Sequence, residues 1–157
     1  MPGLDRIDLD LLSALAEDPR TTVVSLSESL SLSRNTIQTR LARLEQSGFF
    51  LSYERCFSPD LLGFGLKAFV NIEVRQAELP RITAELARIP EILQAHRLSG
   101  PIDVLAHVAC RDARHLFDTD ARIRAIEGVE RTETSLATGE VIGFRVAGLL
   151  GLARREH

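Results

Sequence analysis

The sequence predicts an α+β protein: an N-terminal helix-turn-helix domain, winged-helix-like, followed by a C-terminal ferredoxin-like βαββαβ domain. Up to about residue 47, apolar residues recur every three or four positions, as in amphipathic helices. After residue 65, strand-like and helical patterns alternate in the order β-α-β-β-α-β. We therefore divide the 157 residues into a helix-turn-helix domain at 1–50, a linker strand and connector at 51–65, and a second domain at 66–157.

The first two helices of the N-terminal domain have clear boundaries. The first carries an apolar stripe that includes Leu4, Ile7 and Leu11, and Pro19 ends it because proline cannot continue a helix. A second short helix is expected over Val23–Leu30, and the letters SLS then make a tight turn.

The third helix begins after Ser33, whose hydroxyl can accept a hydrogen bond from a free amide of the first turn. Ile37, Leu41 and Leu44 form its buried stripe. Gly48 is well placed to end it, because the residue after a helix often has a positive φ.

The second half of the chain supplies the remaining elements. A strand is expected at 49–57 (FFLSYERCF), followed by a connector rich in turn residues (SPDLLGFG). Further strands are expected at 66–75, 91–98, 102–110 and 129–137, with helices at 78–89 and 112–126. A last strand is predicted near 140–147 (EVIGFRVA).

The overall composition is that of an ordinary globular protein, with 45% hydrophobic residues, 26% charged residues and a net charge of -3. No apolar run reaches the roughly 18 residues of a membrane span. The acidic start, MPGLDRIDLDLL, does not resemble a signal peptide. We therefore expect a cytoplasmic protein with no membrane partner.

Motifs for catalysis or metal binding are missing from the sequence. Cys56 and Cys110 have neither the number nor the spacing of a disulfide framework or zinc site, and the four histidines are scattered. No G-x-S-x-G, G-x-G-x-x-G or P-loop pattern occurs. We predict no catalytic residue, no metal and no cofactor, and a protein that is not an enzyme.

The outward side of the third helix carries side chains that suit a DNA groove. Arginine can bind guanine with two hydrogen bonds, and asparagine or glutamine can do the same for adenine, while arginine and threonine also contact phosphates. The alternative is a solvated amphipathic helix, in which arginine and glutamine are simply good helix formers. The residues that fall on the outward side or near its boundary are Arg34, Asn35, Thr36, Gln38, Thr39, Arg40 and Arg43.

The charge balance shows that one such helix would bind weakly. Residues 1–60 carry nine acidic residues against six arginines, so the domain is not basic. Only the third helix has a local excess, with Arg34, Arg40 and Arg43 against Glu45. DNA binding therefore requires several copies of the helix presented together, which predicts a homo-oligomer.

The segment LDRIDLDLLSALAEDPRTTVVSLSESLSLSRNTIQTRLARLEQSGFF resembles the N-terminal signature of the Lrp/AsnC (feast/famine) transcription regulators. The residues that carry the likeness read S-x-x-T-I-x-x-R-L-x-x-L-E, followed by a glycine. The likeness continues through FSPDLLG, LSGPIDVLAHVACRD and IEGVERTETS, and so covers nearly the whole chain in order.

This resemblance implies a sequence-specific regulator of transcription whose partner is double-stranded DNA. The expected DNA-binding residues are Ser33, Arg34, Asn35, Thr36, Gln38, Thr39, Arg40 and Arg43. Arg34, Asn35, Gln38 and Thr39 would read bases or groove edges, and Ser33, Arg40 and Arg43 would lie nearer the phosphates. The alternative role for Arg40 is a structural ion pair with an acid such as Glu45 or Asp5.

The resemblance also implies that residues 66–157 sense a ligand and assemble the protein. Two C-terminal sheets would pair in a dimer, the dimers would form tetramers or octamers, and an effector, usually an amino acid, would bind between C-terminal domains. The expected effector-binding residues are Ser99, Gly100, Pro101, Asp103, Thr134 and Ser135.

This chain departs from the family pattern in the expected effector loop. Pro101 and Ile102 replace the acid and the aromatic residue that usually stand between the glycine and the aspartate. Pro101 also lacks the backbone N–H that a carboxylate ligand could use. The departure favours a different ligand, or weak or lost binding. For Thr134 and Ser135 the alternative is ordinary strand pairing.

Two rival functions start from the same fold. Haem-pathway decarboxylases of this architecture would need a basic, histidine-bearing cleft, for which only His96, Arg97, His107 and Arg111 are available, and these form no recognisable set. A ligand-sensing protein that has lost DNA binding would have no use for the polar outward side of residues 34–43.

Overall fold

The computed structural model describes residues 3–155 and contains two compact units. The first holds the chain up to Arg55 together with the chain from Ile142 onward, and the second holds Cys56–Val141. The chain therefore passes between the units twice.

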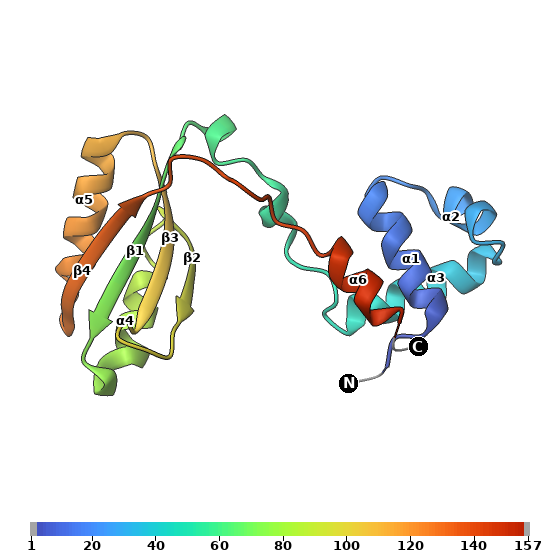
Figure 1. Ribbon diagram of the computed structural model, residues 1–157, viewed down its shortest axis with the longest axis horizontal. Helices are drawn as coiled ribbons and strands as arrows, with labels where there is room; N and C mark the ends of the chain where they lie inside the picture. Colours follow the sequence, from blue (N-terminus) through green and yellow to red (C-terminus); the bar gives the residue numbers. More distant parts are fainter. Residues whose placement is uncertain (1–2, 156–157) are drawn as a thin grey trace. The chain divides into compact units, whose positions relative to one another are not determined.

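The first unit contains the predicted helix-turn-helix, formed by α1 (Arg6–Glu17), α2 (Val23–Ser29) and α3 (Arg34–Gln46) (Figure 1). Leu11, Leu26 and Ile37, one from each helix, are at most 1% exposed and form its core. Ser33 is the N-cap of α3, and Gly48, at φ +71°, follows its C-terminal end as predicted.

The prediction of a strand at 49–57 is wrong. These residues instead form an irregular segment with a short 3₁₀ helix, Tyr53–Cys56, and a second 3₁₀ helix follows at Asp60–Leu62. In the part of the chain that the structure describes, no strand occurs before Leu66. Alternating apolar residues such as Phe49 and Leu51 do suit a strand, but a strand also needs a partner to satisfy its backbone groups.

The prediction of a strand near 140–147 is also wrong. The prediction that 66–157 forms one domain differs from the structure at the C-terminal end of that range. Residues 147–153 form a helix, α6 (Ala147–Ala153), that packs on α1 in the first unit. Leu150 contacts the core of that unit, and Arg154 pairs with Asp10 at 2.7 Å.

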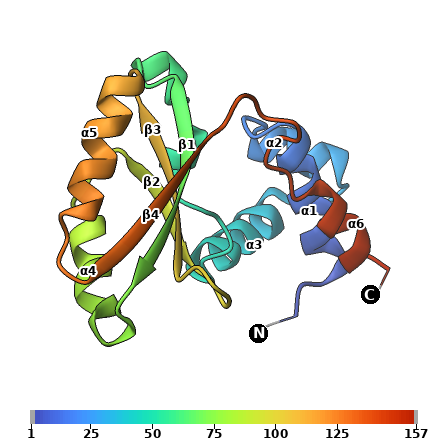
Figure 2. The ribbon, with the colours of Figure 1, turned by 60° about the vertical axis from the view of Figure 1, so that its left-hand side comes forward.

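The second unit has the predicted ferredoxin-like order of elements. These are β1 (Leu66–Val74), α4 (Leu79–Leu86), β2 (Ile92–Arg97), β3 (Val104–Cys110), α5 (Ala113–Arg124) and β4 (Val129–Leu136). The strands form an antiparallel sheet in the order β2-β3-β1-β4. Both helices lie on the same face of this sheet (Figure 2).

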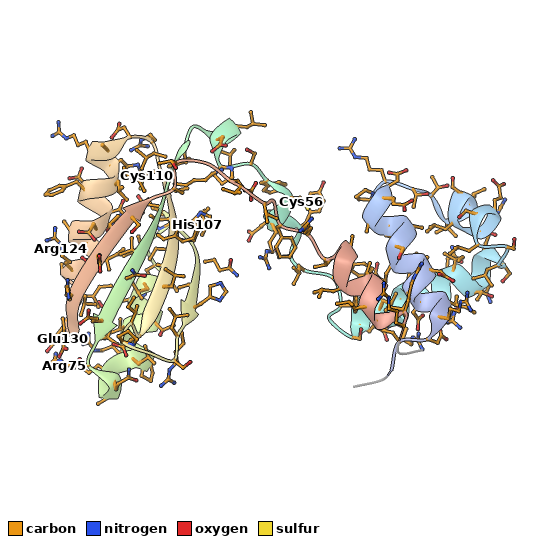
Figure 3. The ribbon with its side chains drawn as sticks, viewed as in Figure 1. Cys56, Arg75, His107, Cys110, Arg124 and Glu130 are labelled. Carbon is orange, nitrogen blue, oxygen red and sulfur yellow. The ribbon has the colours of Figure 1, made fainter. Side chains whose placement is uncertain are left out.

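The two faces of the sheet differ in burial. On β1, Ala68, Val70 and Ile72 are fully buried in the core against the helices. The alternate positions face the other way, where the Phe69 ring stacks on His107 with centroids 4.9 Å apart. His107 and Cys110, both labelled in Figure 3, lie on opposite faces of β3 because they are three positions apart. We call the face that carries Phe69 and His107 the open face.

Candidate nucleic-acid interface and effector region

The side of α3 that we expect to meet DNA is exposed. Arg34, Asn35, Gln38 and Thr39 are exposed, whereas Ile37 is fully buried one position away. Thr36 and Arg40 are intermediate, as expected at the boundary of the buried stripe. Helical geometry therefore places the polar side chains together on one surface.

Local hydrogen bonds separate these side chains into two groups. The Ser33 hydroxyl accepts the Thr36 N–H at 3.1 Å and lies 2.8 Å from the Thr36 hydroxyl, and the Thr39 hydroxyl donates to the Asn35 carbonyl at 2.9 Å. Within residues 3–155, the Arg34, Asn35 and Gln38 side chains have no hydrogen-bond partner. These three are available to bind a ligand.

A shallow depression of about 370 Å³ runs along the same surface. Asn35 and Thr39 line it from the N-terminal part of α3, and Arg40 and Arg43 line it from the next turn. The structure thus brings the predicted DNA-binding residues together on one helix and its N-cap.

Arg40 and Arg43 are also part of an ion-pair cluster with the start of α1, which we call the α1–α3 clamp (Asp5, Asp8, Arg40, Arg43). Arg40 Nη1 lies 2.6 Å from Asp5 Oδ2 and 2.8 Å from Asp8 Oδ1. Arg43 Nη2 binds the other Asp8 oxygen. The Asp8 side chain is fully buried, whereas the side chains of Asp5 and Arg43 are each 51% exposed.

The clamp also shapes the first turn of α1. Asp5 and Asp8 form a capping box, in which each carboxylate accepts the backbone N–H of the other residue, at 2.9 and 3.0 Å. The hydrogen bond from Arg40 lowers the pKa of Asp5, and the same contact raises the pKa of Arg40. Asp5 is therefore held in its ionised form.

Of the two roles weighed for Arg40, the structure contains the ion pair, made with Asp5 rather than Glu45, and a phosphate contact stays a prediction. Sequence reasoning missed Asp8 as a functional residue. The signal was present in the three-residue spacing of Asp5 and Asp8, which is the spacing of a capping box.

In the effector region, the connection between β2 and β3 holds Ser99, Gly100, Pro101 and Asp103. The Asp103 carboxylate accepts the Val74 N–H at 2.7 Å and also the amide of Gln76. Gln76 in turn accepts a hydrogen bond from Arg97 at 3.2 Å. Asp103 is therefore already engaged in holding this turn against the end of β1.

Thr134 and Ser135 lie elsewhere on the sheet. They stand opposite Val70 and Phe69 of β1, several residues from the Val74 end that Asp103 contacts. The Thr134 hydroxyl donates to Asp120 of α5 at 3.2 Å, so Thr134 faces the helices and Ser135 faces the open face. Within one chain, the two parts of the predicted effector set are not brought together.

Three of the four residues considered for the rival enzyme make other contacts. Arg97 donates to Gln76, His107 stacks on Phe69, and Arg111 lies over the Phe64 ring. Burial and the nearby Lys67 charge lower the pKa of His107. Among residues 3–155, no group of three or more metal-ligating side chains occurs, and no helix is long and apolar enough to cross a membrane.

Comparison with known proteins gives a consistent result. Residues 4–50 match the family described as winged helix-turn-helix DNA-binding, and residues 67–146 match the Lrp/AsnC ligand binding domain. The chain is 34% identical to the proline dehydrogenase transcriptional activator of Rhizobium radiobacter, over 83% of this chain and 86% of that protein.

Two solved structures are similar over nearly their whole length. AsnC of E. coli is 25% identical with a TM-score of 0.83, over 92% of this chain and 98% of that one. A transcriptional regulator from Neisseria meningitidis, solved as a complex with L-Met, is 28% identical with a TM-score of 0.81, over 93% and 99%.

Proposed function

The chain belongs to the Lrp/AsnC family of transcription regulators, and we propose that it binds double-stranded DNA sequence-specifically through α3. The observation that carries the proposal is the exposed group Arg34, Asn35 and Gln38. Their polar ends have no partner within the described chain and lie at the start of a helix that follows a tight turn. The early residues of such a helix are those that meet base edges in the major groove.

The remaining residues of the interface would fix the helix on the DNA backbone. Ser33 and Thr36 lie at the N-terminus of α3, where free backbone amides and the helix dipole favour a phosphate. Thr39 would contact a groove edge. Arg43 is half exposed and lines the depression, so its guanidinium can approach a phosphate, whereas Arg40 is only 21% exposed.

Assembly supplies the affinity that one helix lacks. We infer that two copies pair through the open face, where Phe69 is 40% exposed on the side of the sheet away from the helices, and that dimers associate further into tetramers or octamers. When two α3 helices are linked in one dimer, binding of the first to DNA makes binding of the second effectively intramolecular, which raises the overall affinity.

For the effector we propose a small molecule, an amino acid, bound between C-terminal domains. Ser99, Gly100, Pro101 and Asp103 lie apart from Thr134 and Ser135 within one chain, so a shared site would take one group from each of two chains. The match to the Lrp/AsnC ligand binding domain and the L-Met complex of the Neisseria meningitidis relative support this class of ligand.

Selection of duplexes from a randomised pool tests the DNA-binding proposal. Wild-type protein should enrich a defined motif, and Gln38→Ala should change the preferred base at one position, where a good bidentate pair contributes about 1–3 kcal/mol. Gln46→Ala is the matched control, because Gln46 is an exposed glutamine at the far end of α3. An identical motif for Gln38→Ala and wild type would refute base reading by Gln38.

The effector proposal has its own test. Each of the twenty amino acids is added to the protein bound to its selected duplex, and fluorescence anisotropy reports the change in affinity. We expect at least one amino acid to shift the binding curve, and Asp103→Asn to reduce that shift. If none changes either DNA affinity or the sedimentation coefficient, the effector is not an amino acid.

A further inference from the structure

The three arginines expected to meet DNA differ in how their charge is compensated. Within the described chain Arg34 has no acidic partner, whereas Arg40 and Arg43 are bound to Asp5 and Asp8 in the α1–α3 clamp. Two arginines and two aspartates leave the clamp with no net charge. The local positive excess that the sequence shows on α3 is therefore largely cancelled by the start of α1.

We propose that Asp5 masks the charge of Arg40 and thereby limits the affinity of the protein for DNA of any sequence. This inference rests on the proposed function, since it concerns how α3 divides its affinity between base contacts and phosphate attraction. Sequence-independent attraction holds a regulator on the many sites that carry no operator, so a regulator gains by limiting it.

The geometry singles out Asp5 as the group that masks Arg40. Arg40 Nη1 lies within 2.7 Å of both Asp5 oxygens and 2.8 Å from one Asp8 oxygen. Asp8 is fully buried and shared with Arg43, whereas Asp5 is half exposed at the surface. Asp5 can therefore be neutralised without placing an uncompensated group inside the protein.

Arg40 stands where an unmasked charge would act on DNA. It lines the same depression as Asn35 and Thr39 of the proposed reading surface. A positive charge released there would attract the phosphates that flank the groove, and each phosphate contact adds about 0.9 to the steepness of the salt dependence.

Asp5→Asn tests whether the Asp5 carboxylate compensates the charge of Arg40. Asparagine is as good an N-cap as aspartate, and its amide oxygen can still accept the Asp8 N–H. The matched control is Asp10→Asn, which removes one negative charge from the same helix. Asp10 pairs with Arg154, which follows α6 in the sequence, and not with an arginine of α3.

The experiment uses the full-length protein and fluorescence anisotropy on the selected duplex and on a scrambled duplex, from about 50 to 200 mM salt. Asp5→Asn should bind the scrambled duplex more tightly, with a log–log salt slope steeper by up to about 0.9 per α3 helix in contact. Asp10→Asn should keep the wild-type slope, and Asp5→Asn combined with Arg40→Gln should return to it.

Equal slopes for Asp5→Asn and Asp10→Asn, with wild-type protein bound to DNA, would overturn the inference and leave the proposed function intact. The inference is also overturned if Asp5→Asn combined with Arg40→Gln, which leaves the clamp without net charge, has a slope flatter than wild type by a full contact, because Arg40 would then already reach a phosphate. If no variant and no wild-type protein binds either duplex, the proposed function falls and the inference falls with it.

Discussion

Replacing Asp8 by Asn tests whether the α1–α3 clamp holds the helix-turn-helix together. The substitution keeps the shape of the side chain and removes its charge. One carboxylate oxygen becomes an NH₂ group that faces the guanidinium of Arg40 or Arg43, so a donor meets a donor. The side chain is fully buried, so water cannot replace the lost partner.

The cost follows from the surroundings of the clamp. Breaking a buried ion pair costs about 3–5 kcal/mol because the remaining charge is left unpaired. Here Arg40 keeps its contact with Asp5, and Arg43 is half exposed and can take up water. We therefore expect a smaller cost, a loss of about 2–3 kcal/mol from the free energy of unfolding of the first unit.

Amide hydrogen exchange followed by NMR measures this loss in one unit at a time. Exchange of core amides in α1 and α3, such as those of Leu12 and Ile37, should speed up about 30- to 150-fold. Val70 in the second unit should be unaffected, because it belongs to a separate core.

Asp10→Asn is the control for the Asp8 substitution. It breaks a pair whose two side chains are about 40% exposed, which costs at most about 1 kcal/mol. If Asp8→Asn and Asp10→Asn changed the exchange rates of the first unit by the same small factor, the clamp would not be a major source of its stability.

Three further predictions concern stability and titration. Gly128→Ala should lower the stability of the second unit by about 2 kcal/mol, because φ is +89° and the new methyl group would lie 3.1 Å from Ile82. Gly48→Ala, at φ +71° in open space, should cost only about 1 kcal/mol, and thermal denaturation of the two variants compares these losses. The pKa of His107 should lie below 6.5 in an NMR titration and should rise when Lys67 is replaced by methionine. As pH falls, the histidine of the unfolded chain is protonated before that of the folded chain, so the stability that His107 contributes is complete above pH 6.5 and is lost as pH falls toward the folded pKa. Deleting residues 142–157 should cost the first unit about 1–2 kcal/mol, because the α6 contacts on α1 are lost, and a chemical denaturation of the truncated protein that matches wild type would contradict this.

Much of the fold was predictable from the sequence because its signals are local. Apolar spacing, the Ser33 cap and Gly48 define α3 without reference to the rest of the chain. The β-α-β-β-α-β order likewise follows from short patterns, and the structure confirms it. The errors at 49–57 and 140–147 have one cause, since alternating apolar residues indicate a strand only when another strand is present to pair with it.

The candidate site was less accessible from the sequence. The outward side of α3 follows from helical periodicity, but the pairing of Arg40 with Asp5 joins residues 35 positions apart and depends on how α1 packs on α3. Asp103 shows the same limit. Its side chain matches a family position, yet the structure engages it with Val74 and Gln76, contacts that no sequence spacing reveals.

The most direct test of the central claim, that α3 reads DNA, is fluorescence anisotropy on the duplex that lies upstream of the gene for this protein. The comparison is a scrambled duplex of the same composition, at two salt concentrations. We predict tighter binding to the natural duplex, with binding to both duplexes weakening as salt rises. No binding to either duplex at low salt would contradict the claim.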